Sequence, residues 1–372
     1  MSINLLDLSE QSKIIKKNLL LAIEDIIDST DFIQGKQVQE LEKILESYTG
    51  ATHCITCGNG TDALQIALGA AELEPNQYII CPSFTFIATA EVIPRMGLIP
   101  YFVDVEKDSF NISITQIKEA IQKILNDGGS VGAIISVDLY GLPADYSSIS
   151  ALAKENNIIF ISDCAQSFGA KFQSMSVCSL PDIATTSFFP TKPLGCYGDG
   201  GAIFTSNEKY ANIARSLAVH GKGDNKYDNV RIGFNSRLDT IQAAVLLEKF
   251  KLFDAELEMR QKVADTYSQL INHKVILPKF YSGLLSAWAQ YTLRLESAQE
   301  RAQLQKFLSL SQIPTGIYYP KPMHAQLAYS DFPMSPSPIS DYLADRVLSL
   351  PMSPYLSDQQ IQKITDSINE FF

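Results

Sequence analysis

The chain has 372 residues, of which 46% are hydrophobic and 19% are charged, and its formal net charge is -11. A chain of this length and composition can bury a large core, and we expect two domains. The acidic balance argues against non-specific binding to nucleic acid or to an anionic membrane, because the overall field repels phosphate groups.

An amphipathic helix is expected near the N-terminus. The apolar run at residues 18–23 is short, follows several lysines and continues into Glu24 and Asp25. It is typical of neither a signal peptide nor a membrane span, and no other stretch is long and apolar enough to cross a bilayer. We therefore expect a cytoplasmic protein that does not bind membranes.

Apolar segments alternate with helical or loop segments up to about Asn207, which predicts an α/β fold with a mostly parallel sheet. The expected strands are Cys54–Cys57, Tyr78–Pro82, Pro100–Val105, Ala133–Tyr140, Ile158–Cys164, Thr185–Phe189 and Ala202–Thr205.

The six cysteines are scattered, and four of them fall in or beside apparent strands, which is typical of reduced thiols. Cys54 and Cys57 have the spacing of a redox or zinc motif. No second pair exists, however, and a strand would turn these two side chains to opposite faces. The histidines show no ligand spacing either, so no metal site is predicted.

The first strand runs into the loop Gly58-Asn59-Gly60-Thr61-Asp62, and a helical pattern begins directly after it. Free amides at the N-terminus of a helix bind a phosphate dianion, and glycine lets the anion approach closely. We therefore assign Gly60, Thr61 and Asp62 to a phosphate-binding loop. Ser187 is expected to add a hydroxyl donor on the same side.

A lysine and a carboxylate follow later strands. Asp163 comes after the apolar run at residues 158–161, so it is expected at the carboxyl end of a buried strand, where open α/β sheets bind their ligands. Lys192 lies between a Ser/aromatic run and a dense glycine cluster. A crowded, partly desolvated lysine spends time unprotonated, as an amine that attacks an aldehyde must.

The last third of the chain has a different pattern of expected elements. A long helix is expected at Leu238–Leu270. The elements expected after it are a half-exposed strand at Ser286–Leu295, a helix at Ala298–Leu308 and a Pro/Ser loop at Pro333–Pro338. We predict a large cofactor-binding domain over residues 1–250, including the N-terminal segment, and a small C-terminal α/β domain over residues 251–372.

The lysine, the carboxylate and the anion site match the three handles of pyridoxal 5'-phosphate (PLP), which are its aldehyde, its ring nitrogen and its phosphate. A carboxylate at Asp163 would keep the ring nitrogen protonated. The glycines at residues 195–201 also suggest a dinucleotide fingerprint. That interpretation is weak, because these glycines precede an apolar strand, whereas a dinucleotide loop follows a strand and opens a helix.

Five sequence runs, and their order along the chain, resemble the DegT/DnrJ/EryC1/StrS family of PLP-dependent nucleotide-sugar aminotransferases. The runs are GNGTDAL (58–64), PSFTF (82–86), DCAQSFGA (163–170), SFFPTKPLGCYGDGGA (187–202) and GFNSRLDTIQAA (233–244). The resemblance spans nearly the whole chain. It implies the PLP-dependent aminotransferase fold type I, with a seven-stranded sheet, and a homodimer with shared active sites.

Within this family the chain is most similar to the enzymes that aminate C3 of UDP-2-acetamido-2-deoxy-3-oxo-glucuronate for bacterial surface polysaccharide, such as the lipopolysaccharide O-antigen. The resemblance implies ping-pong transamination, with Lys192 as the catalytic residue and L-glutamate as the amino donor. It also implies that Phe86 stacks on the pyridine ring and that Gln166 donates to the phenolic oxygen of the cofactor.

The resemblance further assigns residues to the partner subunit's site and to the sugar. Asn235 would reach the cofactor phosphate across the dimer, and Arg237 would lie near the sugar carboxylate, since a guanidinium suits bidentate contact with a uronate. By its place shortly before the same run, Tyr227 is expected to line the sugar site with Arg237. Tyr318 and Tyr319 stand where the family usually has His-Tyr, so a phenol replaces a histidine near the sugar.

Two alternatives stay open. The substrate could be a dTDP-linked 3-keto-6-deoxyhexose rather than the uronate. The chain could also be a catalytically silent binding or regulatory protein on the same fold, although the intact Lys192, Asp163 and Ser187 argue against this.

Overall fold

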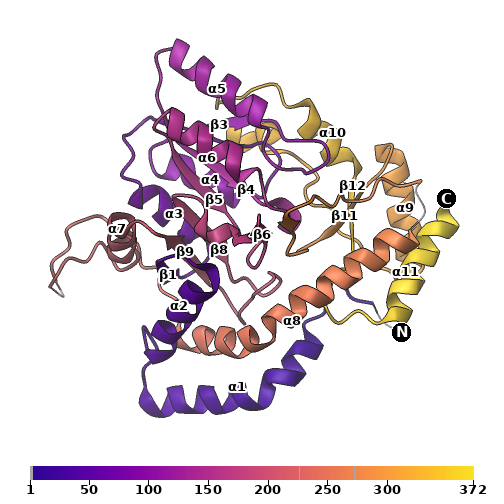
Figure 1. Cartoon of the computed structure of the whole chain (residues 1–372), viewed down its shortest axis with the longest axis horizontal. Coiled ribbons are helices and arrows are strands. Elements are labelled where there is room, and N and C mark those ends of the chain that lie inside the picture. Colours follow the sequence, from indigo (N-terminus) through magenta and orange to yellow (C-terminus); the bar gives the residue numbers. More distant parts are fainter. Residues whose placement is uncertain (1–2, 226, 272–273) are drawn as a thin grey trace.

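A seven-stranded sheet lies at the centre of the computed structural model, which describes residues 3–225, 227–271 and 274–372. Its strand order is β1-β9-β8-β5-β4-β2-β3 (Figure 1). Four neighbouring pairs are parallel, and the two pairs that β9 makes are antiparallel. The predicted α/β fold with a seven-stranded, mostly parallel sheet is therefore confirmed.

All seven predicted strands are present, with ends that differ by a few residues. Their bounds are β1 His53–Cys57, β2 Tyr78–Pro82, β3 Ile99–Val103, β4 Val131–Val137, β5 Ile159–Asp163, β8 Ile183–Ser187 and β9 Gly201–Thr205. The prediction that β4 runs to Tyr140 is wrong, because Tyr140 has a φ of 61° and lies in a short 3-10 turn, Leu139–Gly141.

Helices cover both faces of this sheet. One core contains residues of α3 (Gly60–Ala70), α4 (Ala88–Arg95) and α7 (Glu208–Ala218). The helices that contribute to the core of the other face are α1 (Ser9–Ser29), α2 (Lys36–Thr49), α5 (Ile114–Asn126), α6 (Tyr146–Glu155) and α8 (Thr240–Leu270). No helix among the described residues is both long and apolar enough to span a bilayer.

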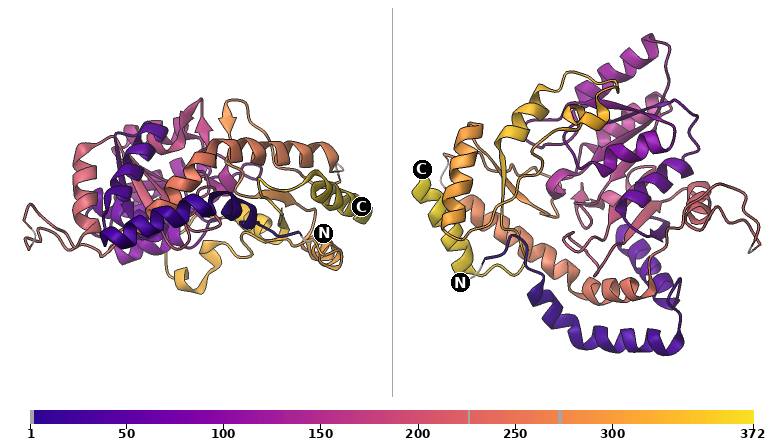
Figure 2. Two further views of the ribbon diagram at one scale, coloured as in Figure 1. Left: turned by 90° about the horizontal axis from the view of Figure 1, so that it is seen from below. Right: turned by 180° about the vertical axis from the view of Figure 1, so that it is seen from behind.

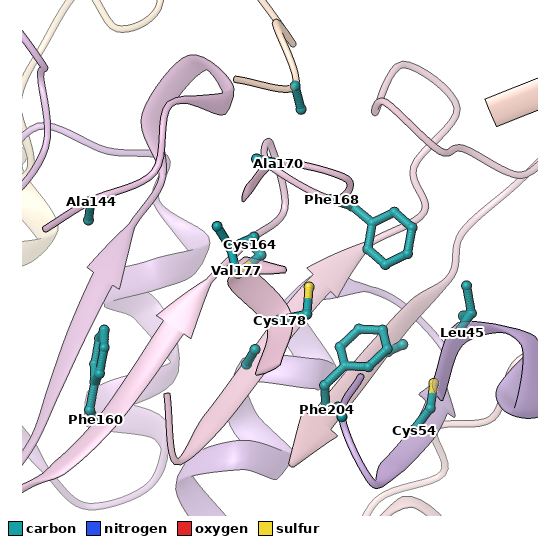
Figure 3. Packing of buried hydrophobic residues seen from close by; sticks show 14 of the residues in the cluster. Leu45, Cys54, Ala144, Phe160, Cys164, Phe168, Ala170, Val177, Cys178 and Phe204 are labelled. Carbon is teal, nitrogen blue, oxygen red and sulfur yellow. The ribbon is translucent and has the colours of Figure 1, made fainter. Parts of the chain in front are cut away.

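The alternation of side chains along β1 separates its two cysteines. Cys54 packs into the core that also contains Leu45 and Phe204, where Phe168 stacks on Phe204 with ring centroids 6.0 Å apart (Figure 3). Cys57 belongs to the core of the opposite face. The two thiols therefore point to opposite faces, as predicted, and cannot form a shared site.

The long helix α8 leads from the sheet to a third core (Figure 2). This core includes residues of α9 (Ala298–Leu310), α11 (Asp358–Phe371) and the antiparallel pair of β11 (Tyr291–Arg294) and β12 (Val347–Leu350). Short strands β6 (Lys171–Phe172), β7 (Met175–Ser176) and β10 (Leu284–Leu285) form a small separate sheet.

The predicted half-exposed strand at Ser286–Leu295 is shorter and fully buried. Tyr291 packs on Tyr267 of α8 with ring centroids 5.0 Å apart. The polar residues that alternate with the apolar ones are buried too, because Thr292 bonds to the Ser349 hydroxyl at 2.8 Å and Arg294 pairs with Asp108 at 2.9 Å. Paired polar groups, rather than solvent, cover the second face of this strand.

Between α9 and β12, which both belong to the third core, the chain returns to the edge of the main sheet. Ser335 donates its amide to the Phe102 carbonyl on β3 at 2.8 Å, which covers the outer edge of that strand. Helix α10 (Pro338–Arg346) follows, and residues from it share a core with residues of the loops after β2, β3 and β4. The domain division at residue 250 stays a prediction.

Candidate active site

The predicted site residues gather at one edge of the sheet. The loop after β1, Asp163 at the end of β5 and Ser187 at the end of β8 all lie where these strands finish. Because β1, β5 and β8 point in the same direction, their carboxyl ends share this edge. This is the position at which open α/β sheets bind ligands.

The loop between β1 and α3, which is the proposed phosphate loop, ends in a capped helix N-terminus. Helix α3 begins at Gly60, and Asn59 caps it by accepting the Asp62 amide at 2.8 Å. A Cβ atom on Gly60 would lie 2.6 Å from the Ser187 Cβ, so only glycine lets Ser187 approach the helix N-terminus this closely. The fit of these two residues produces a cradle suited to an anion.

Asp62 makes two contacts at this loop. Its amide bonds to Asn59, and its carboxylate accepts the Ser236 hydroxyl at 2.7 Å. Ser236 also accepts the Gly58 amide at 2.9 Å. In the part of the chain that the structure describes, the amides of Gly60 and Thr61 have no acceptor, as is usual for a first helical turn, and they remain available to a ligand.

Lys192 lies in a tight loop after β8. Its amide donates to the Phe189 carbonyl at 2.9 Å, and a Cβ atom on Gly195 would lie 2.6 Å from that same oxygen. The Lys192 side chain is only partly exposed. Burial lowers the pKa of the Lys192 amine below its ordinary value, and the nearby Asp163 carboxylate opposes that shift only in part. The amine is therefore neutral more often than a surface lysine.

Asp163 is 6% exposed and is held by two donors. The Thr89 hydroxyl donates to one oxygen at 2.8 Å, and the Ala165 amide donates to the other at 3.1 Å. Burial raises the pKa of Asp163 above its ordinary value, while these hydrogen bonds and the charge of Lys192 oppose the rise. The carboxylate is thus fixed in place and lacks a full counter-charge, which suits it to pair with a cationic ring nitrogen.

Gln166 connects two segments beside this carboxylate. Its oxygen accepts the Tyr140 amide at 2.6 Å, and its nitrogen donates to the Tyr319 hydroxyl at 3.1 Å. Phe86 lies with its ring centroid 5.9 Å from that of Tyr319 and is 52% exposed. Phe86 and Tyr319 therefore form an aromatic wall with a face of Phe86 left open.

A second buried carboxylate supports the loop that carries Gln166 and Tyr140. Asp138 accepts the Ala144 amide at 2.8 Å, the Tyr146 hydroxyl at 2.8 Å and the Ser167 hydroxyl at 2.7 Å. Burial raises the pKa of Asp138 to about 6, although these hydrogen bonds oppose the rise.

The sequence did not identify Thr89, Tyr140, Asp138 or Ser236 as parts of this site. Of these four residues, only Asp138 could have been found from the sequence pattern, because it comes at the end of an apolar strand as Asp163 does. Thr89 looks like any small residue of a first helical turn, so its bond to Asp163 could be found only from the folded chain.

The residues assigned to the sugar lie in two places. Tyr319 belongs to the aromatic wall, and the Tyr318 carbonyl accepts the Tyr140 hydroxyl beside it. The Tyr318 ring lies over Gly316, where a Cβ atom would come within 2.7 Å of it. These two tyrosines are therefore joined to the Lys192 site within one chain.

Asn235 and Arg237 flank Ser236, which bonds to the phosphate loop, but their own side chains bond to each other. The Arg237 guanidinium donates to the Asn235 side chain, and Arg237 lines a separate cavity of about 120 Å³ together with Arg215. Tyr227 is 86% exposed. Across residues 3–225, 227–271 and 274–372, no hydrogen bond or ion pair joins Asn235 or Arg237 to Lys192 or Asp163.

Comparison with known proteins gives a consistent result. Residues 13–369 match the sequence profile described as the DegT/DnrJ/EryC1/StrS aminotransferase family. The chain is 41% identical, over 97% of its length and 98% of the relative's, to a UDP-2-acetamido-2-deoxy-3-oxo-D-glucuronate aminotransferase of Pseudomonas aeruginosa.

Two solved structures extend this similarity. A DegT/DnrJ/EryC1/StrS aminotransferase from Brucella abortus superposes with a TM-score of 0.97 at 44% identity, covering 99% of each chain. NtdA from Bacillus subtilis, solved with bound pyridoxamine phosphate (PMP), has a TM-score of 0.89 at 26% identity and covers 99% of this chain and 83% of its own.

Proposed function

Because this chain belongs to the DegT/DnrJ/EryC1/StrS aminotransferase family, we propose that it transfers an amino group to C3 of a 3-oxo UDP-sugar, UDP-2-acetamido-2-deoxy-3-oxo-glucuronate. It is a PLP-dependent sugar aminotransferase by family. The identity and coverage shared with the Pseudomonas aeruginosa enzyme support the choice of substrate. We infer a role in bacterial surface polysaccharide biosynthesis in the cytoplasm.

The described residues fit the cofactor of this family. The Gly60 and Thr61 amides and the Ser187 hydroxyl would bind its phosphate, Asp163 its ring nitrogen, and Phe86 the face of its ring. Gln166 would donate to its phenolic oxygen. When bound, PLP supplies an electron sink that stabilises charge at a carbon from which a proton is removed.

The chain's own residues define how the proton moves. The pKa of Lys192 is lowered, so its amine is often unprotonated. Nζ can therefore accept a proton from one carbon and donate it to a second carbon nearby. Asp163 cannot move away, because Thr89 and Ala165 hold both of its oxygens. The observation that carries this proposal is the convergence of Lys192, Asp163 and the Gly60–Ser187 cradle at one edge of the sheet.

The direct test is the Lys192→Ala variant. It should abolish turnover and leave PMP binding largely intact, because PMP needs the cradle and Asp163 but no covalent link to the lysine. Lys209→Ala, at an exposed lysine of α7 that pairs with Glu72, is the matched control and should retain activity. Normal turnover by the Lys192→Ala variant would refute the assignment.

Arg237 supports the uronate as substrate. Its guanidinium contacts Asn235, and among the described residues no carboxylate forms an ion pair with it. An unneutralised guanidinium suits bidentate binding of a sugar carboxylate. Tyr227, Tyr318 and Tyr319 would complete the sugar site.

The substrate is tested with a panel of UDP-linked and dTDP-linked 3-oxo sugars and L-glutamate, the proposed donor. The wild-type enzyme should prefer the UDP-linked uronate. Arg237→Ala should lose activity with the uronate and keep activity with neutral sugars, whereas Arg237→Lys should retain part of it. Equal losses with charged and neutral sugars would argue against a carboxylate contact, and a preference for a dTDP-linked 3-keto-6-deoxyhexose would replace the proposed substrate.

We also propose a homodimer in which Asn235 and Arg237 serve the partner subunit's site. Among the described residues the side chains of Asn235 and Arg237 bond to each other and not to Lys192 or Asp163, which leaves them available to a partner subunit. The large apolar side chains that α1 exposes also support this arrangement, with Ile14 at 57%, Leu20 at 56%, Leu21 at 55% and Ile27 at 55%. Exposed apolar side chains gathered on one helix are typical of an interface.

A further inference from the structure

His324 connects two segments of the proposed active site. Its Nδ1 atom contacts the Ser83 hydroxyl in a short hydrogen bond, and its Nε2 atom lies 3.1 Å from a carboxylate oxygen of Asp341 on α10. The imidazole is mostly buried, with 14% of its side chain exposed. Since a carboxylate only accepts, Nε2 donates to Asp341, and Nδ1 shares a hydrogen with the Ser83 hydroxyl.

Ser83 begins the segment that carries the first half of the aromatic wall. It follows β2 directly and is completely buried. Phe86 lies three residues later, and Thr89, which donates to Asp163, lies three residues after that. The position of Ser83 therefore sets where two of the side chains beside the cofactor can lie.

His324 ends the segment that carries the other half of the wall. Tyr319 lies five residues earlier and contacts Phe86, Phe84 and Gln166. The Met323 amide donates to the Ser83 carbonyl at 2.7 Å, so the two segments meet through the backbone as well as through His324.

The order Ser83, His324, Asp341 has the connectivity of a hydrolase triad. That function does not fit, because a nucleophile must reach a substrate and Ser83 has no exposed surface. A hydrogen bond between buried groups of two different segments instead fixes their relative position.

We propose that His324 is a positioning residue, which holds the Ser83–Phe86 segment against the Tyr319 segment and so sets the spacing of the aromatic wall. The inference rests on the proposed function, because that wall is assigned to the cofactor and the sugar. It adds His324, Ser83 and Asp341 to the residues on which the reaction depends.

The test uses the full-length enzyme loaded with PLP. Ser83→Ala removes one hydroxyl without a large cavity, and His324→Ala removes the imidazole. Each should lower kcat/KM for the sugar nucleotide by about 10-fold or more, because small displacements of positioned groups cost this much. Each should also change the visible circular dichroism of the bound cofactor, which reports the surroundings of its ring.

The dichroism separates a change at the cofactor from a loss of stability, and the remaining results test whether Ser83 and His324 act through one contact. The double variant should be about as impaired as the worse single variant, since both remove one contact. His324→Asn should recover most of the activity that His324→Ala loses, because its side-chain amide can still form the hydrogen bond with Ser83. Asp345→Asn, at an exposed residue of the same helix, is the matched control and should behave as wild type.

The inference is overturned if Ser83→Ala retains the wild-type kcat/KM and dichroism, or if the losses of the two single variants multiply in the double variant. Should His324→Ala fail to fold, Ser83→Ala and His324→Asn still decide the question. Failure of the wild-type enzyme to bind PLP or transaminate would instead refute the proposed function, so the two failures are distinguishable.

Discussion

At the scale of single residues, Lys192 and Asp163 show how burial adapts ordinary side chains to chemistry. Desolvation disfavours both charged forms, so it lowers the pKa of the lysine and raises that of the carboxylate. Their mutual attraction works against both shifts. The pair is thus poised to exchange charge with a ligand rather than locked into an ion pair.

Thr89 should matter more for catalysis than for stability. Thr89→Val keeps the shape of the side chain and removes the donor to Asp163. The pKa of Asp163 should then rise further, so the carboxylate is lost at a higher pH as the solution is acidified. We expect kcat to fall about 10-fold, as for other residues that orient a functional group, and the acidic limb of the pH–rate profile to move to higher pH.

The control for this variant is Thr205→Val. Thr205 is buried and donates to the Asp182 carbonyl at 2.7 Å, at the opposite end of the sheet from the site. Thr205→Val should lower the melting temperature about as much as Thr89→Val does, and it should leave the pH–rate profile unchanged. An unshifted profile for Thr89→Val would show that Thr89 does not act on Asp163.

Lys249 gives a prediction for the pH dependence of stability. It is 1% exposed, lies over the Tyr197 ring at 4.5 Å, and burial lowers its pKa from 10.5 to about 8. Between these two pKa values the unfolded chain binds more protons than the folded one, so this residue's contribution to the unfolding free energy increases as pH rises through that window.

Lys249→Met should therefore be more stable than wild type at neutral pH, and the advantage should shrink by about 2 kcal/mol between about pH 7 and about pH 10. Denaturant unfolding of both proteins across this range measures the difference. An advantage that does not change with pH would mean that Lys249 has an ordinary pKa in the folded protein.

At the scale of elements, the carboxylate of Asp104 joins the main sheet to helix α10. It follows β3 and accepts the Ile339 amide at 2.8 Å, the Ser340 amide at 2.8 Å and the Ser340 hydroxyl at 2.6 Å. A negative charge at a helix N-terminus is stabilised both by these donors and by the helix dipole. The same helix carries Asp341, the partner of His324.

Asp104→Asn should loosen the start of α10. The amide nitrogen would face backbone donors, and we expect a local loss of about 2 kcal/mol. Hydrogen exchange of the Ile339 and Ser340 amides should then be roughly 30-fold faster, since 1.36 kcal/mol corresponds to a factor of ten.

Asp145→Asn provides the comparison, because Asp145 caps α6 through the Ser148 amide at 3.1 Å but is exposed. It should leave exchange in α10 unchanged. If Asp104→Asn also leaves that exchange unchanged, Asp104 does not hold the helix.

At the scale of the whole molecule, the proposed dimer can be tested by mixing. In a shared site, Lys192→Ala disables its own subunit's site, whereas Asn235→Ala disables the partner's. A dimer with one copy of each variant then has one intact site. Random reassociation of the two inactive proteins should therefore restore about a quarter of the wild-type activity.

Sites completed within one chain predict a different outcome. The mixture would then show only the sum of the activities of the two separate variants. Size-exclusion chromatography of each variant before mixing verifies that neither substitution prevents association.

Local patterns in the sequence were enough to predict the strands, the glycine loop before α3 and the places of Lys192, Asp163 and Ser187 beside strand ends. The reason is that each depends on residues adjacent in the chain: apolar runs make buried strands, and a glycine loop before a helix makes an anion site. The ends of strands were less accurate. Tyr140 continues an apolar run, and only its left-handed backbone shows that β4 has ended.

The tertiary structure alone decided which distant residues meet. Nothing in the local sequence around Thr89 or His324 indicates that they bond to Asp163 and Ser83, 74 and 241 residues away. It also decided that the polar face of β11 is buried, because Asp108 and Ser349 approach from other segments. Sequence patterns record the preference of each residue for solvent or core, whereas these contacts depend on where the whole chain brings its partners.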